Sequence, residues 1–342
     1  MRRFGKGFIV TTALVASLLA SGQQASAVVT WEFSEESVAL GISAVSPHVE
    51  RTGSVDRIWY PSLPSTAVSD CTDAGACTLV SGVGRLSSDF TAITLSNGTR
   101  RAYFVDMTPG TSTKTVSSAQ CATAECLSVG TSTPIAADVA VPMTEKAWGV
   151  PDAVVTPDGK VRVYLVVSPT MSNSCPEKVR SYISNDGISF TKESGWRLEN
   201  GISVDPEILR AKTGDWFMIL ADGPGCGDRV QKLYTSTSND GLTWSTPQKI
   251  SGSDLRRLDP TGYEVSTNVF RIYYATAVAG ALGDVTYTIK RGTIAIKQSS
   301  AEMSITTGNK NSTKTTITCV KGKTTKKVTN VNPKCPSGFK KK

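Results

Sequence analysis

The sequence predicts an all-β protein, a five-bladed β-propeller followed by a short basic C-terminal extension. Three observations lead to this fold class. One phrase of the sequence occurs twice without a gap, the repeat consists of short apolar strands separated by glycine or asparagine turns, and no competing stretch has a helical period. Units that cannot bury their faces alone stack, and closing them into a ring removes the exposed sheet edges. A double-sheet sandwich is the alternative, but it does not account for the repeat.

The repeat is clearest between residues 148 and 244. One copy starts at Pro151 and the next at Pro206, 55 residues later, and each copy contains an Asn-Asp-Gly turn typical of a tight hairpin. Extending the frame in both directions predicts five units that start near residues 46, 89, 150, 205 and 259. We expect residues 28–45 to add a strand that closes the ring, with Trp31 as its anchor.

The N-terminus, residues 1–27, has the order of features of a secretory signal peptide. Three basic residues precede an apolar run from Phe8 to Ala20, and the small residues Ala25-Ser26-Ala27 follow it. The run is shorter than the ~20 residues that a membrane span requires. We therefore expect a secreted, extracellular protein with no membrane span, whose propeller occupies residues 28–298.

The C-terminal residues 299–342 form a separate, basic segment. The chain carries a net charge of +8, but residues 1–27 hold three positive charges and residues 303–342 hold ten lysines and no acid, so the remainder is at −5. This asymmetry argues against a nucleic-acid partner for the body of the protein. The segment reads as a Ser/Thr/Lys-rich linker and a disulfide-closed tail. It resembles a lysine-rich ending of secreted actinobacterial proteins, either as a spacer or as a contact to an anionic cell wall.

The eight cysteines predict disulfides in an oxidising compartment. Their even number and the closeness of several pairs favour four bonds, although the connectivity stays open; the cysteines are Cys71, Cys77, Cys121, Cys126, Cys175, Cys226, Cys319 and Cys335. A zinc or other metal centre is not expected, because there is no Cys-x-x-Cys and the chain has a single histidine, His48.

Two columns of residues at the starts of the five units are the candidate site. The residues just before the aligned proline are Ser46, Asp89, Val150, Asp205 and Asp259, and those just after it are His48, Thr91, Asp152, Glu207 and Thr261. The first strand of a propeller blade starts at the central funnel, so these side chains should converge. Converging carboxylates are costly unless a ligand binds or their pKa values move apart, and glycoside hydrolysis requires two of them. They would also permit a structural calcium ion; no other cofactor is expected.

Two phrases resemble family 43 glycosidases of the arabinanase, levansucrase and invertase superfamily, which share a five-bladed propeller. They are Trp148-Gly-Val-Pro-Asp152 and Asp205-Pro206, and the resemblance covers about residues 45–297. It implies that Asp89 is the general base and that Asp205 tunes the acid and orients the sugar. The family has a glutamate as general acid where this chain has Asp259. The acid is therefore Asp259 with a shorter arm, or Glu207 or Glu264 in its place, or it is absent.

The resemblance implies a monomeric glycoside hydrolase that acts on a polysaccharide or oligosaccharide in its funnel, by inversion. The expected catalytic residues are Asp89, Asp205, Asp259 and Glu207, and Asp152, Trp148 and His48 are expected to line the substrate site, although His48 also fits a packing role. Whether the protein is an enzyme stays open, because a non-catalytic propeller that binds a glycan or cell surface fits the same residues. A sialidase is less favoured, since the hairpins lack one residue of the Asp-box motif.

Overall fold

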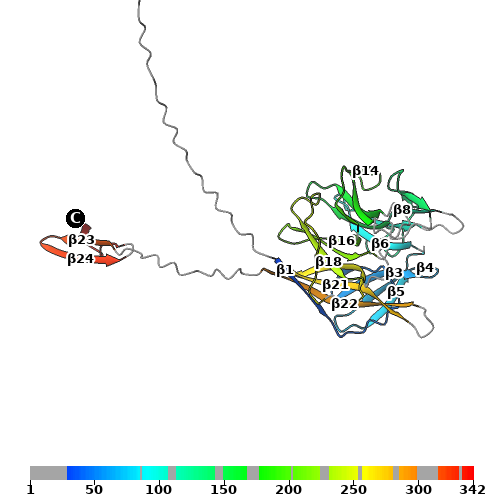
Figure 1. Cartoon of the computed structure of the whole chain (residues 1–342), viewed down its shortest axis with the longest axis horizontal. Coiled ribbons are helices and arrows are strands. Elements are labelled where there is room, and N and C mark those ends of the chain that lie inside the picture. Colours follow the sequence, from blue (N-terminus) through cyan, green and yellow to red (C-terminus); the bar gives the residue numbers. More distant parts are fainter. Residues whose placement is uncertain are drawn as a thin grey trace, which may run out of the picture. The chain divides into compact units, whose positions relative to one another are not determined.

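The computed structural model describes residues 29–84, 87–106, 113–142, 149–167, 177–201, 203–223, 231–252, 256–279, 285–298, 315–330 and 333–342. The chain divides into two compact units (Figure 1): a main unit, Val29–Lys297, and a second unit made of residues 1–28 and 298–342. The predicted signal peptide lies outside the described residues. The described residues contain strands and no helix, so none of them forms a helix that could span a membrane, and the all-β prediction is confirmed.

The strands of the main unit form five antiparallel sheets within the described residues. The first contains β2 (His48–Thr52), β3 (Val55–Ser62), β4 (Ser65–Cys71) and β5 (Cys77–Gly82). The second contains β6 (Ser87–Thr94), β7 (Arg100–Asp106), β8 (Thr113–Gln120) and β10 (Ala140–Pro142), with β9 (Thr133–Pro134) also pairing with β8. The third contains β11 (Gly149–Val155), β12 (Val161–Val167), β13 (Glu177–Ser184) and β14 (Thr191–Lys192), with β15 (Leu198–Gly201) pairing with β13.

The last two sheets complete the main unit. The fourth contains β16 (Ser203–Arg210), β17 (Trp216–Asp222), β18 (Leu233–Ser238) and β19 (Gln248–Lys249). The fifth contains β20 (Leu258–Ser266), β21 (Val269–Ala279), β22 (Val285–Gln298) and, as its outer strand, β1 (Val29–Glu35) from the start of the chain. The N-terminal strand thus joins the last sheet, as the sequence predicts for the segment around Trp31, whose indole is buried against Phe217.

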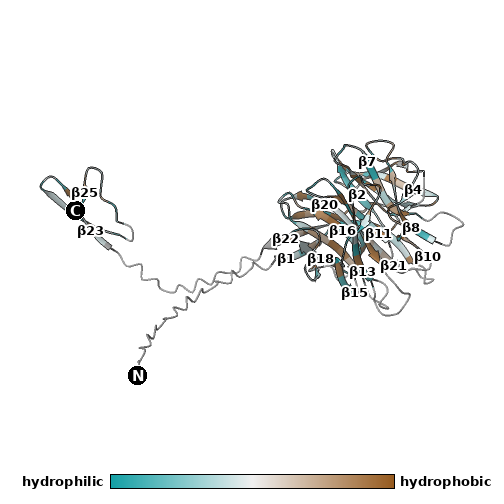
Figure 2. Cartoon of the chain, turned by 90° about the horizontal axis from the view of Figure 1, so that it is seen from above, coloured by the Kyte–Doolittle hydropathy of each residue, from teal (hydrophilic) through white to brown (hydrophobic). Residues whose placement is uncertain are grey.

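The five sheets follow one another in a closed cycle. Their first strands, β2, β6, β11, β16 and β20, contact one another in chain order, and β20 contacts β2. Each pair of neighbouring sheets also shares its own hydrophobic cluster, centred on Phe90, Tyr182, Met218, Phe270 and Ile58 respectively. Apolar residues follow the strands of this unit (Figure 2). Every sheet therefore packs both faces against its two neighbours, which removes the apolar residues of both faces from water.

The Asn-Asp-Gly turns join one sheet to the preceding one. The hydroxyl of Tyr103 on β7 donates to the carbonyl of Gly187, and that of Tyr164 on β12 donates to the carbonyl of Gly241, at 2.9 and 2.6 Å. Both glycines have positive φ, and a Cβ would lie 2.9 Å and 2.8 Å from the respective tyrosine oxygens. Glycine alone adopts a positive φ without strain and has no Cβ that would clash with the tyrosine hydroxyl. The repeated turn therefore contributes to the packing between sheets.

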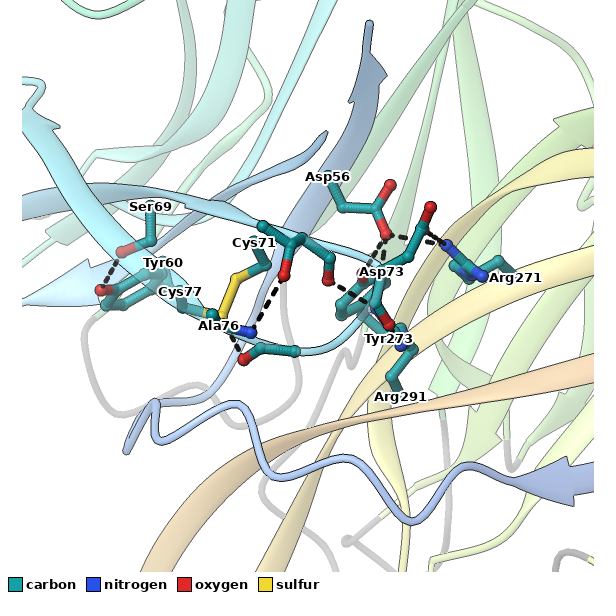
Figure 3. The surroundings of a disulfide bond; sticks show 12 residues. Asp56, Tyr60, Ser69, Cys71, Asp73, Ala76, Cys77, Arg271, Tyr273 and Arg291 are labelled. Atoms are coloured by element: carbon teal, nitrogen blue, oxygen red, sulfur yellow. Dashed lines mark hydrogen bonds and ion pairs between the residues drawn. A yellow bond between two sulfur atoms is a disulfide. The ribbon is translucent and has the colours of Figure 1, made fainter. Parts of the chain in front are cut away.

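The junction of the fifth and first sheets holds a polar cluster (Figure 3). Asp56 on β3 is fully buried and accepts hydrogen bonds from the hydroxyl of Tyr273 and, at 2.9 and 3.3 Å, from Arg51 and Arg271. Asp73, in the loop closed by the Cys71–Cys77 disulfide, binds the same two arginines at 2.9 and 2.6 Å. These bonds fasten the first sheet to the last, where the chain closes its ring.

The second unit contains a three-stranded sheet in the order β24 (Thr324–Asn330), β23 (Thr315–Lys321), β25 (Lys340–Lys341). Its disulfide joins Cys319 to Cys335. With Cys71–Cys77 and Cys121–Cys126 in the main unit, three of the predicted disulfides are confirmed. Cys175 and Cys226 lie outside the described residues.

Candidate active site

The start of each inner strand has the same irregular backbone. The residues before the aligned proline or phenylalanine all have positive φ, namely Ser46 (47°), Asp89 (51°), Val150 (40°), Asp205 (53°) and Asp259 (49°). In β6, β11, β16 and β20 the register shifts across this residue and the one after it, which is the geometry of a bulge. A left-handed non-glycine residue costs roughly 1–2 kcal/mol, so its repetition at five equivalent positions indicates a constraint on this edge of the sheets.

The two predicted columns line one central cavity. We call the five residues with positive φ at the strand starts the entrance column; all five line the cavity. The second column consists of His48, Thr91, Asp152, Glu207 and Thr261, and all of these except Thr261 line it too, as do the residues between the two columns. The cavity has a volume of about 30 Å³. That is room for one or two water molecules.

Three aspartates of the entrance column lie together in this cavity. The backbone N–H of Asp259 donates to Oδ2 of Asp205 at 3.2 Å, and the N–H of Ser46 donates to Oδ2 of Asp259 at 2.9 Å. Asp89 accepts from the hydroxyl of Ser88 at 3.2 Å. The three come from three sheets, the second, fourth and fifth, because the bulge points the same position of each inner strand toward the centre.

Burial and mutual repulsion raise the pKa values of these aspartates. Burial, followed by the charge of neighbouring Asp259, raises the pKa of Asp205 well above its usual range. Burial and the charge of Asp89 raise the pKa of Asp259 to about 6, and burial raises the pKa of Asp89. Three carboxyl groups in one small cavity oppose one another's ionisation, so this cluster keeps protons to a higher pH than ordinary aspartates do.

The second column ties neighbouring inner strands together. Oδ2 of Asp152 accepts the N–H of Ile208 on the next sheet at 2.6 Å, and Oε1 of Glu207 accepts that of Gly262 at 3.0 Å. Nε2 of His48 lies 3.4 Å from the N–H of Ala92, and the hydroxyl of Thr261 accepts that of Val49 at 3.2 Å. Four of the five positions thus satisfy a backbone donor of the following sheet, which is a structural role.

Asp152 and Glu207 nevertheless have perturbed pKa values. Burial raises the pKa of Asp152 to about 6, and burial together with the charge of Asp152 raises the pKa of Glu207 well above its usual range. On the side of this column away from the entrance column, a second cavity of about 410 Å³ is lined by the same groups and by Glu50 and Glu264. The carboxyl groups of the site therefore form two layers, and only the entrance column faces the strand starts.

The remaining predicted residues lie elsewhere. Glu264 accepts the backbone N–H of Lys212 at 2.7 Å and lines only the second of the two cavities. His48 lies 3.4 Å from Glu50, whose ionised form Arg100 also binds. Burial opposes the ionisation of Glu50, but the hydrogen bonds and charges of His48 and Arg100 outweigh it and lower its pKa. Trp148 lies outside the described residues.

Metal binding finds no support among the residues that the structure describes, which contain no group of three or more His, Cys, Asp and Glu side chains able to hold an ion. At least one carboxylate oxygen in each of Asp205, Asp259, Asp152 and Glu207 is bonded to a backbone N–H group. A structural calcium ion stays a prediction.

Sequence reasoning identified both columns and missed the donors around them. Ser46 was placed in the first column without a role, yet its N–H binds Oδ2 of Asp259. The pair Glu50 and Arg100 comes from two different sheets, and no local pattern connects them.

The architecture can be compared with known proteins. An endo-arabinase from Bacteroides thetaiotaomicron superposes with a TM-score of 0.55 and 12% identity, over 77% of this chain and 98% of the other. A thermostable family-43 glycoside hydrolase gives 0.51 and 14%, over 75% and 92%. The chain has the fold of family 43 glycoside hydrolases. An α-L-arabinanase from Penicillium chrysogenum, solved with arabinobiose, gives 0.51 and 10%, over 77% and 98%. At these identities the likeness establishes the propeller fold alone. No protein-family model and no curated protein matches the sequence.

Proposed function

We propose that the five sheets are the blades of a five-bladed propeller whose central cavity is the active site of a glycoside hydrolase. The observation that carries the proposal is the convergence of Asp89, Asp205 and Asp259 in one cavity. The fold likeness supports a glycan as substrate, since an arabinanase with this fold was solved with arabinobiose. An arabinose-containing glycan is therefore the first substrate class to test.

The three aspartates have different roles in the proposed reaction because they differ in protonation. Asp89 is the general base that takes a proton from the attacking water. Asp259, with its pKa raised to about 6, is the general acid that protonates the leaving oxygen. Asp205 keeps its proton to a higher pH than an ordinary aspartate and holds the backbone of Asp259 in place. A raised pKa is what an acid catalyst needs near neutral pH, because the group must carry its proton when the substrate binds.

The resemblance to family 43 favours inversion. A direct displacement needs a water molecule between the base and the sugar, and the central cavity has room for water beside Asp89. The sugar would lie at the mouth of the cavity with its anomeric carbon toward Asp89. A retaining mechanism would instead need a carboxylate in contact with that carbon.

Asp259 is a better candidate for the acid than the two glutamates. Glu207 lies in the second column, where Oε1 is bonded to Gly262 and Thr261 at 3.0 and 3.2 Å. Glu264 holds the backbone of Lys212 and lies away from the cavity of the entrance column. Asp259 alone of the three stands in the same column as Asp89 and Asp205.

The setting of this reaction follows from the predicted signal peptide. We propose that the protein is secreted and acts outside the cell as a monomer. No step of the proposed reaction passes through a metal ion. A calcium ion bound by the central carboxylates would stabilise the ring, and metal analysis of the purified protein tests this.

A non-catalytic glycan-binding propeller is the second candidate. It is favoured by the aspartate where family 43 has a longer glutamate, and by the hydrogen bonds that hold Asp259 to Ser46 and Asp205. Such a protein would bind an oligosaccharide at the same face and release no sugar.

The test is a screen of the secreted form on aryl glycosides and arabinan, with release of reducing sugar as the readout. We expect activity on at least one arabinose-containing substrate, and its reduction by roughly 10²–10⁴-fold in Asp205→Asn and Asp259→Asn. The matched control is Asp158→Asn, whose carboxylate is exposed on the far turn of the third sheet and should leave the rate unchanged.

The outcomes separate the two candidates. Binding of arabino-oligosaccharides in calorimetry without sugar release would favour the binding protein. Equal activity of wild type, Asp205→Asn and Asp259→Asn on a cleaved substrate would place the active site elsewhere.

A further inference from the structure

The second unit presents a sheet whose two faces differ. The register pairs Thr316 with Thr329, Thr318 with Lys327 and Val320 with Thr325, and Val320 also with Lys340. Directly paired residues point to the same side of a sheet, and alternate residues of a strand share a side. These seven residues therefore form one face, which we call the threonine face.

The opposite face is the one that the disulfide covers. Ile317 and Cys319 are buried there, and Cys319 is bonded to Cys335. Lys326, paired with Cys319, lies 5.3 Å from the ring centroid of Phe339. The segment 333–339 thus packs on this side, which we call the disulfide face, and supplies the small core of the unit.

The threonine face is exposed and cationic. Thr316, Thr325, Lys327, Thr329 and Lys340 are exposed, and Thr318 and Val320 are half-buried. Residues 303–342 contain ten lysines and no acidic residue, so no acidic side chain of these residues neutralises the ammonium groups. A sheet face with hydroxyl donors beside unneutralised cations is complementary to an anionic polymer.

The side chains of the threonine face indicate which class of anionic polymer it binds. All of the basic residues of the segment are lysines. Lysine binds phosphate as a compact point charge, whereas arginine is the residue suited to planar, bidentate carboxylate recognition. The face carries no aromatic side chain that could enter a bilayer interface or stack on bases. A hydrated phosphodiester chain without bases or acyl chains on its surface meets these conditions.

We propose that the threonine face binds a poly(polyol phosphate) of the teichoic-acid type, with Lys327 and Lys340 pairing with successive phosphates and the threonine hydroxyls donating to phosphate oxygens. This contact is independent of the proposed glycosidase activity, and it would hold a secreted protein at an anionic wall.

The sharpest test compares two variants with the same change in charge. The full mature chain is passed over immobilised poly(glycerol phosphate) teichoic acid at moderate salt, as wild type, as Lys327→Gln/Lys340→Gln on the threonine face, and as Lys326→Gln/Lys341→Gln on the disulfide face. Each lysine next to an anionic surface contributes about a factor of five to affinity. We expect the first variant to bind about 30-fold more weakly and the second less than about threefold.

Several outcomes would overturn the proposal. Equal losses in the two variants would mean that charge alone acts and that no face is selected. If the wild-type protein does not bind the immobilised teichoic acid, this polymer is not its partner. Tighter binding to double-stranded DNA, to phosphatidylglycerol vesicles or to polygalacturonate at the same salt would replace the phosphodiester polymer by that class of ligand. Because glycan hydrolysis is measured separately, a failure here leaves the active-site proposal untouched.

Discussion

At the scale of single residues, the site depends on backbone conformations that side chains normally avoid. Val150 has a φ of 40°, which is an outlier for a β-branched residue, and it stands where Asp205 and Asp259 stand on the next two sheets. The strain is accepted at all five positions, including the two that carry no acid. The bulge is therefore a property of the fold, and the identity of the residue placed on it decides the chemistry.

The turn glycines offer a test of packing at this scale. Gly187→Ala should destabilise the protein by about 1–2 kcal/mol from its φ of 72° alone and by about 1–3 kcal/mol more from the contact with the hydroxyl of Tyr103. Gly98→Ala is the matched control, because Gly98 also has positive φ but its Cβ would meet nothing within 4 Å. Denaturant unfolding of both variants measures the difference. Equal losses would show that the tyrosine contact contributes nothing.

At the scale of elements, the inner strands could be predicted well because their signal is local. The aligned prolines, the turn glycines and the aromatic second strands set a frame with units near 46, 89, 150, 205 and 259, and the inner strands begin at residues 48, 87, 149, 203 and 258. The strand around Trp31 was also predicted, since an apolar segment before the first unit has a free edge to fill.

The layering of the site could not be predicted in the same way. The sequence placed Glu207 and Asp205 at nearly the same height, but Glu207 also lines the second cavity, whereas Asp205 lines only the central one; both accept backbone N–H groups of β20. The direction in which each of these side chains points depends on the positive φ at the start of its strand. The amino-acid sequence does not reveal that a non-glycine residue adopts this conformation here. The pairing of Asp56 with Tyr273 and Arg271 joins residues more than 200 positions apart, and a period of about 55 residues gives no information about such a contact.

The polar cluster around Asp56 holds the last sheet against the first. Asp56→Asn should cost about 3–5 kcal/mol, because it removes the buried charge that Arg51, Arg271 and the buried hydroxyl of Tyr273 all bind. Asp73→Asn is the matched control: it contacts the same Arg51 and Arg271, but its side chain is 60% exposed, so the loss of stability should be clearly smaller than in Asp56→Asn. Thermal unfolding of both variants checks this. Similar melting temperatures would show that ring closure does not depend on the buried charge.

At the scale of the whole molecule, the central carboxyl groups link stability to pH. Folding raises the pKa values of Asp89, Asp152, Asp205, Glu207 and Asp259. The folded state then binds more protons than the unfolded state, so the stabilisation is complete below the ordinary carboxyl range and is lost as pH rises through the folded pKa values. The carboxylates with lowered pKa, such as Asp56, act in the opposite sense but only below about pH 4.

The melting temperature should therefore be several degrees higher at about pH 5 than at about pH 8. The double variant Asp205→Asn/Asp259→Asn should reduce this difference, since neutral amides cannot lose a proton. A melting temperature that rises from pH 5 to pH 8 would contradict the raised pKa values of the cluster.

The central claim is that the aspartates on the bulges form a hydrolytic site. It is tested most directly by the rate of sugar release from the best arabinose-containing substrate, measured side by side for wild type and Asp89→Asn. Asp89 accepts hydrogen bonds from the hydroxyls of Ser88 and Ser46, which an amide oxygen can also accept, so its replacement by asparagine should leave the fold intact. We expect a fall in the rate of roughly 10²–10⁴-fold with no decrease in the melting temperature. An unchanged rate in Asp89→Asn would contradict it.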